Sequence, residues 1–391
     1  MKQKGLARER TLFLILIPAL WLFFSMAQQH NQQKVSSVQL QHEVSVTVKL
    51  IQVMVTDKDG KSVIDLTAED FEIYDNSKKM AIAHFEKHSL FSPQDKTEAV
   101  VTSPALSTRS ISRKFILLFD FAYQGFTGIR KARKAALHFI DTQLVPADEV
   151  AIITYSKNKG LSLPQYFTSD HQKIKELVEL LTSSELVGGI TSPGHKPIAG
   201  EDEEKLSLTF NLKKEHYINQ ARQFCMDVIE LAKQLVHIPG TKNIILFSRG
   251  ISNKIIYGQL PEGGDSGGEP ANARLLDLLQ KMGQWLAEAK CFVFAVNTEG
   301  ALSNHFRNKF LAGDLSLRQL TQLSGGKYFD NVASYKGINK EISQMTSVYY
   351  VLGYYLDEKP DGRYHKVEVK VKKKGYVVHG QKGYFYSILF P

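Results

Sequence analysis

The strongest constraint on the fold is a repeated alternation of short apolar runs with longer amphipathic segments. Four runs are almost uninterrupted in their apolar character, at residues 115–120, 150–155, 244–247 and 291–296. Segments with apolar residues at helical spacing lie between and after them, at 128–144, 217–236, 271–289 and 315–323. Uninterrupted apolar runs are typical of strands that are buried on both faces of a sheet. The alternation therefore predicts an α/β fold, in which a doubly wound, mostly parallel sheet carries helices on both faces.

Shorter β patterns flank this α/β region. Residues 40–90 contain several strand-like runs with a hairpin turn signal at Asp59-Gly60, and residues 348–391 contain a half-buried strand at 367–372. Because neither flank alone has many strands, we expect the two to pair into one β-sandwich with the α/β domain inserted. The predicted organisation is a β module at 40–90, a linker at 91–112, the α/β domain at 113–347 and a C-terminal β segment at 348–391.

One irregularity is predicted in the first strand. The apolar alternation runs through residues 44–50 and continues through 51–55 on the opposite parity. Side chains of a strand alternate between its two faces, so a change of parity predicts a β-bulge or a bend near Leu50.

The first 27 residues have the pattern of a secretory signal peptide. Basic residues precede an apolar run at 12–24, small residues follow at Ser25 and Ala27, and the sequence turns polar at Gln28. The apolar run is short for a membrane span, which needs about 20 residues; an uncleaved N-terminal anchor is the alternative. No second apolar segment approaches spanning length. We therefore expect an exported protein that is periplasmic, extracellular or in the cell envelope, with no membrane span in the mature chain.

Composition and motifs argue against nucleic-acid binding and against catalysis. The first 27 residues, with four basic residues and one acidic residue, hold three of the nine net positive charges, and no basic face with interleaved aromatic residues follows. Cys225 and Cys291 lie in apolar segments and are expected to be two buried thiols, although a disulfide between them stays open. No nucleophile elbow, His-Glu-x-x-His pair or phosphate-binding glycine loop is present, so no enzymatic activity is expected.

Several short motifs occur in an order that resembles one protein family. They are VTDKDG at 55–60, LTAEDFEIY at 66–74, FTSD at 167–170, IPGTKN at 238–243, LFS at 246–248, LSGGKYF at 323–329, YYVLGY at 349–354 and GYF at 383–385. Together they are similar to the bacterial VWFA-related proteins, an exported family with a von Willebrand factor type A-like domain. The resemblance covers nearly the whole mature chain and implies the type A fold. Because the biochemical role of this family is largely undefined, the resemblance implies a fold rather than an activity.

Type A domains commonly bind a divalent cation through an Asp-x-Ser-x-Ser loop, a Thr and a second Asp. The resemblance makes Asp120 the first ligand, but Ala122 and Gln124 replace both serines. Thr191 is the candidate for the Thr, and Arg249 stands where the second Asp belongs. Because Mg²⁺ requires a set of oxygen ligands and an arginine repels it, we expect a degenerate site without metal or other cofactor. The Arg249 guanidinium is expected to lie within hydrogen-bonding distance of the Asp120 carboxylate in its place.

The loops around this degenerate site are expected to form a binding rim, with Tyr123, Arg130, Lys131 and Ser248 as candidate residues. Cations in the first turns of a helix oppose the helix dipole, which favours an acidic partner; solvated charges without a role are the alternative. The predicted function is an exported, non-catalytic, protein-binding or adhesion-like module whose partner the sequence does not identify. The alternative function is a structural subunit of a cell-envelope assembly.

Overall fold

A computed structural model describes residues 47–90, 109–110, 112–181, 203–258, 270–298, 313–356 and 360–386, with side chains except at 109–110 and 203–213. All of these residues belong to one compact unit, Thr47–Pro391. The predicted signal peptide, Thr191 and most of the predicted linker lie outside the described residues.

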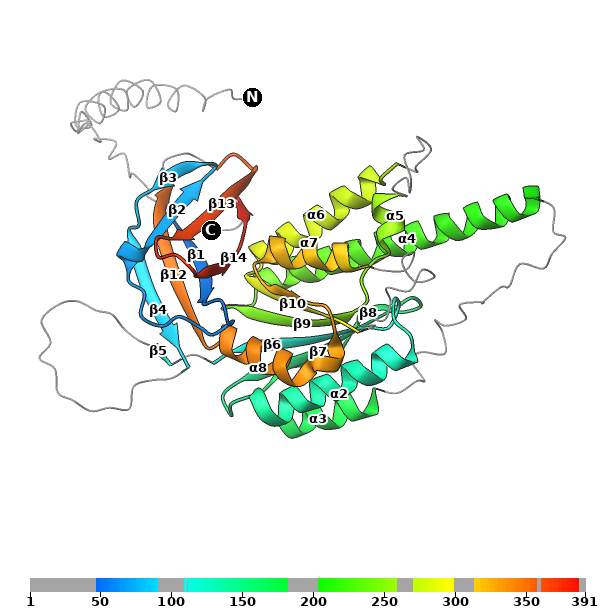
Figure 1. The fold of residues 1–391 in the computed structure, drawn as a ribbon, viewed down its shortest axis with the longest axis horizontal. Coiled ribbons are helices and arrows are strands. Elements are labelled where there is room, and N and C mark those ends of the chain that lie inside the picture. The colour runs from blue at the N-terminus through cyan, green and yellow to red at the C-terminus, as the bar shows by residue number, and fades with distance from the viewer. Residues whose placement is uncertain are drawn as a thin grey trace, which may run out of the picture. The chain divides into compact units, whose positions relative to one another are not determined.

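A mixed sheet of six strands forms the centre of the α/β region (Figure 1). In sheet order the strands are β11 (Lys327–Phe329), β10 (Cys291–Asn297), β9 (Lys242–Ser248), β6 (Lys114–Asp120), β7 (Glu149–Ser156) and β8 (Gly160–Thr168). Neighbouring strands pair in parallel, except that β8 pairs antiparallel with β7. The chain builds the sheet outward from β6, first to one side and then to the other, so the strand order reverses between β6 and β9. The predicted α/β fold with a mostly parallel sheet is confirmed.

Helices cover both faces of this sheet. One face carries α2 (Phe126–Gln143), α3 (His171–Leu180) and α8 (Tyr335–Met345), and the other carries α4 (Glu203–Val236), α5 (Asn253–Tyr257), α6 (Ala273–Glu288) and α7 (Asp314–Ser324). Within β6, Phe115, Leu117 and Phe119 face the first layer of helices, whereas Ile116 and Leu118 face the second. A strand with two buried faces has no polar side, which explains the uninterrupted apolar runs. Among the described residues, no helix is long and apolar enough to cross a membrane.

β8 is the last strand on its side of the sheet and is irregular. Its pairing with β7 shifts register twice, between Val150 and Ile152 and again between Ile152 and Thr154. Pro164, in the middle of β8, has no backbone N–H to donate. The outer side of this strand therefore presents an interrupted row of hydrogen-bonding groups.

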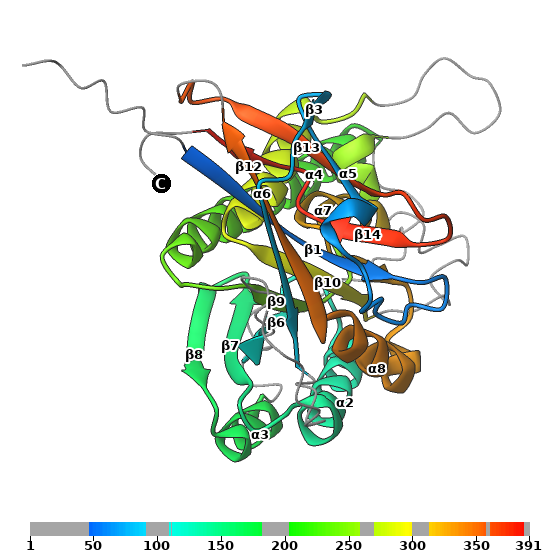
Figure 2. The ribbon, with the colours of Figure 1, turned by 90° about the vertical axis from the view of Figure 1, so that its left-hand side faces the viewer.

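Two further sheets contain strands from both β flanks (Figure 2). The first sheet has the strand order β14 (Val377–Gly380), β1 (Thr47–Thr56), β12 (Val348–Leu356), β4 (His84–Ser89) and β5 (Arg109–Ser110). The second sheet has the strand order β15 (Gly383–Phe385), β13 (Tyr364–Val371), β2 (Phe71–Asp75) and β3 (Lys78–Met80). Two 3-10 turns, η1 (Ala68–Asp70) and η3 (Val332–Ser334), precede β2 and α8.

The N-terminal and C-terminal flanks fold together, as predicted. β1 pairs antiparallel with β12, and β2 pairs antiparallel with β13, so both sheets combine strands from before and after the α/β region. The sheets share one core, in which Val53, Ile73, Tyr350 and Val367 are buried. Within the predicted linker, the structure places the short strand β5, which pairs with the end of β4.

The predicted bulge near Leu50 is wrong. β1 keeps a continuous register with β12 from Thr47 to Val53. Ile51 and Val53 belong to the core of the sandwich, whereas Val48 and Leu50 are 41% and 43% exposed. The apolar parity changes because the two halves of the strand carry apolar residues on opposite faces of the sheet.

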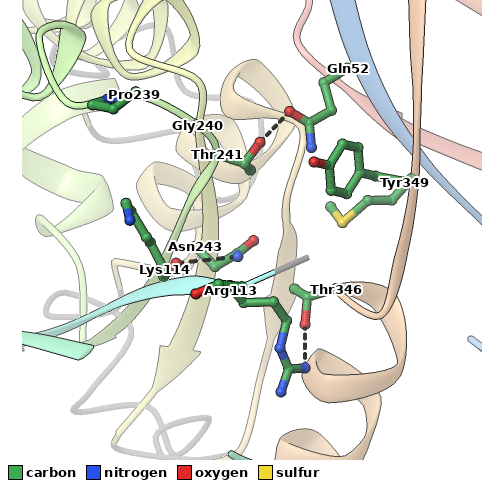
Figure 3. A pocket seen from close by; sticks show the side chains of 11 residues that line it. Gln52, Arg113, Lys114, Pro239, Gly240, Thr241, Asn243, Thr346 and Tyr349 are labelled. Atoms are coloured by element: carbon green, nitrogen blue, oxygen red, sulfur yellow. Dashed lines mark hydrogen bonds between the residues drawn. The ribbon is translucent and has the colours of Figure 1, made fainter. Parts of the chain in front are cut away.

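The amino edge of the six-stranded sheet joins the sandwich through polar contacts (Figure 3). The Thr241 hydroxyl, just before β9, donates to the side-chain oxygen of Gln52 in β1, and the Ser62 hydroxyl donates to the carbonyl of Gln344 in α8. A cavity of about 110 Å³ lies at this joint, between residues of β1 and β12 and the starts of β6 and β9. The sandwich thus covers the amino edge, and the loops that follow the strands lie at the opposite, carboxyl edge.

Candidate functional site

Asp120 and Ser248 form the centre of the candidate site, at the point where the strand order reverses. They are the last residues of the neighbouring strands β6 and β9, and both are buried. The Ser248 hydroxyl donates a hydrogen bond to Oδ2 of Asp120, while the backbone N–H groups of Ala122 and Tyr123 donate to Oδ1 at 2.9 and 3.2 Å. The N–H of Gly250 donates to the Ser248 oxygen at 2.8 Å. Ligands of doubly wound sheets bind at such a reversal, which makes this edge the candidate binding site.

Burial raises the pKa of Asp120 to about 6, because the loss of water disfavours the ionised carboxylate. The hydrogen bonds from Ser248 and from the backbone of Ala122 and Tyr123 lower this pKa, and so does the positive charge of Arg249. The carboxylate is thus surrounded by hydrogen-bond donors at close range.

The predicted direct contact between Arg249 and Asp120 is not found among the described residues, and the Ser248 hydroxyl takes its place. Ser248 is the last residue of β9 and lies beside the carboxylate, whereas Arg249 follows the strand and acts on Asp120 through its charge. Lys157, which follows β7, is a second cation near this carboxylate: burial lowers the pKa of Lys157, Asp120 raises it and Arg249 lowers it. Lys157 has no motif of its own, so the sequence does not signal its role.

The described residues at this edge do not fit a divalent cation. Mg²⁺ and Ca²⁺ take about six or more oxygen ligands, but both oxygens of Asp120 accept hydrogen bonds from protein groups, and the Ala122 side chain has no oxygen. The charges of Arg249 and Lys157 also repel a cation. In the part of the chain that the structure describes, no group of three or more His, Cys, Asp or Glu side chains could hold a metal ion. Thr191, the remaining candidate ligand, lies outside that part.

Two buried polar atoms without a hydrogen-bond partner lie beside the first turn of α2. The Gln124 amide donates to the carbonyl of Phe247 at 3.3 Å, and its Oε1 has no partner among the described residues; the Thr298 hydroxyl has none either. These two atoms lie 3.1 and 3.2 Å from the position that a Cβ would occupy on Gly128. The hydroxyl of Tyr123 is a third such atom. Buried polar atoms of this kind call for water or a ligand.

Among the described residues of the carboxyl edge, the starts of two helices carry exposed apolar side chains. Phe126, the first residue of α2, is 55% exposed, and Leu315, the second residue of α7, is 44% exposed. The backbones of Gly250 and Gly313 lie so close that a side chain on either would overlap the other. This contact fixes the start of α7 beside the end of β9.

The predicted rim residues differ in accessibility. Arg130 is exposed, Lys131 and Tyr123 are half-buried, and Ser248 is buried within the Asp120 hydrogen-bond network. Phe126 and Leu315 are exposed apolar side chains among the described residues of this edge. Sequence reasoning missed them because an exposed apolar residue at a helix start has the same pattern as a buried one.

Cys225 and Cys291 are free and buried. Both lie in the core between the sheet and the layer of α4, α6 and α7. Burial raises the pKa of each thiol to about 12, so neither forms a thiolate near neutral pH. The predicted pair of buried thiols is confirmed.

No protein-family model and no curated protein matches the sequence. Similar solved structures include an aerotolerance-related membrane protein of Bacteroides fragilis NCTC 9343, with 14% identity and a TM-score of 0.35 over 60% of this chain and 100% of that chain. BatB of Bacteroides thetaiotaomicron has 16% identity and a TM-score of 0.35, over 60% and 99% of the two chains. The vWF domain of the type V pili tip protein Mfa5 of Porphyromonas gingivalis has 11% identity and a TM-score of 0.36, over 60% and 95%. The fold assignment rests on strand order and burial rather than on these similarities.

Proposed function

We propose that this chain, with its von Willebrand factor type A-like domain, is an exported, non-catalytic module that binds a protein partner at the carboxyl edge of its six-stranded sheet. The observation that carries the proposal is that two apolar side chains, Phe126 at the start of α2 and Leu315 at the start of α7, are exposed at the edge where Asp120 and Ser248 are buried. Aromatic side chains are enriched at protein interfaces, where an apolar centre is surrounded by polar groups. The sandwich covers the opposite edge, which supports its role as the base of the binding module.

Binding at this edge is proposed to need no metal and no other cofactor. The donors around Asp120 take the place that a cation would occupy in a type A domain with a full ligand set. Partner recognition then depends on apolar contacts with Phe126 and Leu315 and on the charge of the rim. Chelation of divalent cations should leave such binding unchanged.

Affinity capture from the native cell envelope tests this proposal. The edge variant Phe126→Ser, Leu315→Ser removes both exposed apolar side chains, and the matched control Leu163→Ser, Tyr166→Ser removes two exposed apolar side chains from β8. The wild type and the control should retain the same partner, with or without EDTA, and the edge variant should lose it. Equal capture by the edge variant would contradict the proposal.

A second function, as a structural subunit of an envelope assembly, is favoured by an apolar patch on the sandwich. Val48, Leu50 and Tyr355 are exposed on the outer face of the sheet that contains β1 and β12. Side-chain atoms of Leu50 and Val48 lie 2.9 and 3.2 Å from the position that a Cβ would take on Gly353. The absence of a side chain at Gly353 therefore leaves room for both apolar side chains to pack there. The variant Leu50→Ser, Tyr355→Ser should abolish association in this case, while the edge variant should retain it.

A further inference from the structure

α2 and α8 lie side by side in both views of the ribbon (Figures 1 and 2), and Asn339 of α8 donates to the carbonyl of Ala135 in α2 at 2.8 Å. Together the two helices carry six cationic side chains and two acidic ones. The cationic residues are Arg130, Lys131, Arg133, Lys134, Lys336 and Lys340.

Both acidic side chains of these helices pair with lysines of other elements. Asp141 pairs with Lys175 of α3 at 3.0 Å, and Glu341 pairs with Lys327 of β11. Neither is therefore available to the cations of α2 and α8. The two helices carry an excess of positive charge that their own carboxylates do not neutralise.

Four of these cations are exposed, and we call them together the α2–α8 cationic face: Arg130, Lys134, Lys336 and Lys340. The Lys134 ammonium lies 5.8 Å from the centre of the Tyr335 ring, next in sequence to Lys336. The ring of Tyr335 also packs edge-on against His138 of α2, at 5.2 Å between centres. These contacts fix the row of cations on α2, Arg130 and Lys134, relative to the row on α8, Lys336 and Lys340.

Helix stability does not account for this charge. Neither helix has an acidic residue in its first turn, and Lys336 is the second residue of α8. A cation at the positive end of a helix is unfavourable. The arrangement therefore fits a binding role better than a stabilising one.

We propose that the α2–α8 cationic face receives an acidic segment of the protein partner, an inference that rests on the proposed binding function. Arg130 and Lys134 are four residues apart, as are Lys336 and Lys340, so each pair spans about 6 Å along its helix. Carboxylates four residues apart on a helix, or two apart on an extended strand, have nearly the same spacing, about 6 to 7 Å. Such a segment can pair with both rows at once.

The surroundings of the face favour a protein over a membrane. Within α2 and α8 as described, Phe126 is the one large apolar side chain that is exposed, and it lies at the carboxyl edge. Arg130 is one helical turn away from it. A partner that contacts Phe126 can therefore continue directly onto the cationic face.

The test measures binding of a fluorescent oligoglutamate peptide to the whole exported chain. The face variant is Arg130→Gln, Lys134→Gln, Lys336→Gln, Lys340→Gln. The matched control Lys58→Gln, Lys61→Gln, Lys366→Gln, Lys374→Gln removes the same charge from exposed lysines of the sandwich. The face variant should bind the peptide with a Kd about tenfold higher than that of the wild type, because it loses four modest ion pairs. The Kd of the control should stay within about twofold of the wild-type value.

An equal loss in both variants would overturn the proposal, because net charge alone would then explain binding. Stronger binding of phosphatidylglycerol vesicles or of a single-stranded oligonucleotide than of oligoglutamate would overturn the choice of partner. Circular dichroism spectra check that both variants are folded. If the face variant still captures the partner that the edge variant loses, this inference fails while the proposed function stands.

Discussion

Arg113 and Asp148 form a buried ion pair where the chain enters the α/β region, with guanidinium Nε and Nη2 donating to the two carboxylate oxygens at 3.0 and 2.5 Å. Arg113 also donates to the carbonyl of Gln143 at the end of α2 and to Ser343 near the end of α8. A third hydrogen bond goes to the Thr346 hydroxyl just after α8 (Figure 3). One side chain thus joins the entry and the exit of the region inserted into the sandwich.

Arg113→Ala should destabilise the protein by about 3–5 kcal/mol, because it leaves the Asp148 carboxylate buried without a partner. Arg113→Lys should recover little of this loss, since one ammonium cannot replace a planar group with several donors. Lys175→Ala, which removes an exposed ion pair with Asp141, should cost about 0–1 kcal/mol. Urea unfolding measures all three. Similar losses for Arg113→Ala and Lys175→Ala would contradict the role of Arg113.

The stability of the protein should depend on pH through Asp120. Its pKa is 3.8 in an unfolded chain and about 6 in the folded protein, so folding favours the protonated acid. Its contribution to stability is complete below pH 3.8 and is lost as the pH rises through about 6, with a total of roughly 3 kcal/mol.

Asp120→Asn removes this titration. The variant should therefore gain stability relative to the wild type between pH 4 and pH 7, as measured by thermal unfolding in matched buffers. Ser248→Ala serves as a second check, because loss of its hydrogen bond to the carboxylate should raise the pKa of Asp120 and move the transition to higher pH. If the difference in stability between Asp120→Asn and the wild type were the same at all pH values, Asp120 would not be the group that titrates.

Mg²⁺ should not stabilise the protein. Differential scanning calorimetry should give the same Tm in millimolar Mg²⁺ and in EDTA, because protein donors already engage both oxygens of Asp120 and Arg249 adds a positive charge beside it. The variant Ala122→Ser, Gln124→Ser, Arg249→Asp introduces the ligand types of the Asp-x-Ser-x-Ser motif and its second Asp, and is the positive control. A Mg²⁺-dependent rise in Tm of the wild type, absent from Asp120→Asn, would show that the native site binds metal.

Gly250 and Gly240 allow a paired test of the contact between β9 and α7. Both have positive φ, +83° and +81°, so a change to Ala at either site should cost about 1–2 kcal/mol in backbone strain. At Gly240 no atom lies within 4 Å of the added Cβ, whereas at Gly250 the Cβ would overlap the carbonyl oxygen of Gly313. Gly250→Ala should therefore lose clearly more stability in urea unfolding than Gly240→Ala. Equal losses would mean that the start of α7 moves freely.

The central sheet could be predicted from the sequence because burial on both faces leaves a direct trace. The run Phe115 to Phe119 has no polar residue, and the structure places alternate members of it in two separate cores. The pairing of the flanks could be predicted because each has too few strands to be stable alone. The sequence could not show that the strand near Leu50 has no bulge, because apolar side chains on an exposed face have the same pattern as buried ones.

The candidate site could be predicted in position but not in its contacts. The motif identified Asp120 and its neighbours, whereas the choice between Ser248 and Arg249 as its partner depends on side-chain direction at the end of β9. Lys157 and Thr298 approach the same edge from β7 and β10, far away in the sequence. Contacts of this kind arise from the three-dimensional fold and leave no local pattern.

The irregular pairing of β8 has a consequence for molecules that are crowded together. A regular strand at the end of a sheet is a template to which another chain can add a strand, and fibrils grow in this way. Pro164 removes one donor from the middle of β8, and the two register shifts bend the strand away from a flat edge. Even with Leu163 and Tyr166 exposed on it, this edge should resist strand addition between neighbouring copies at high local density.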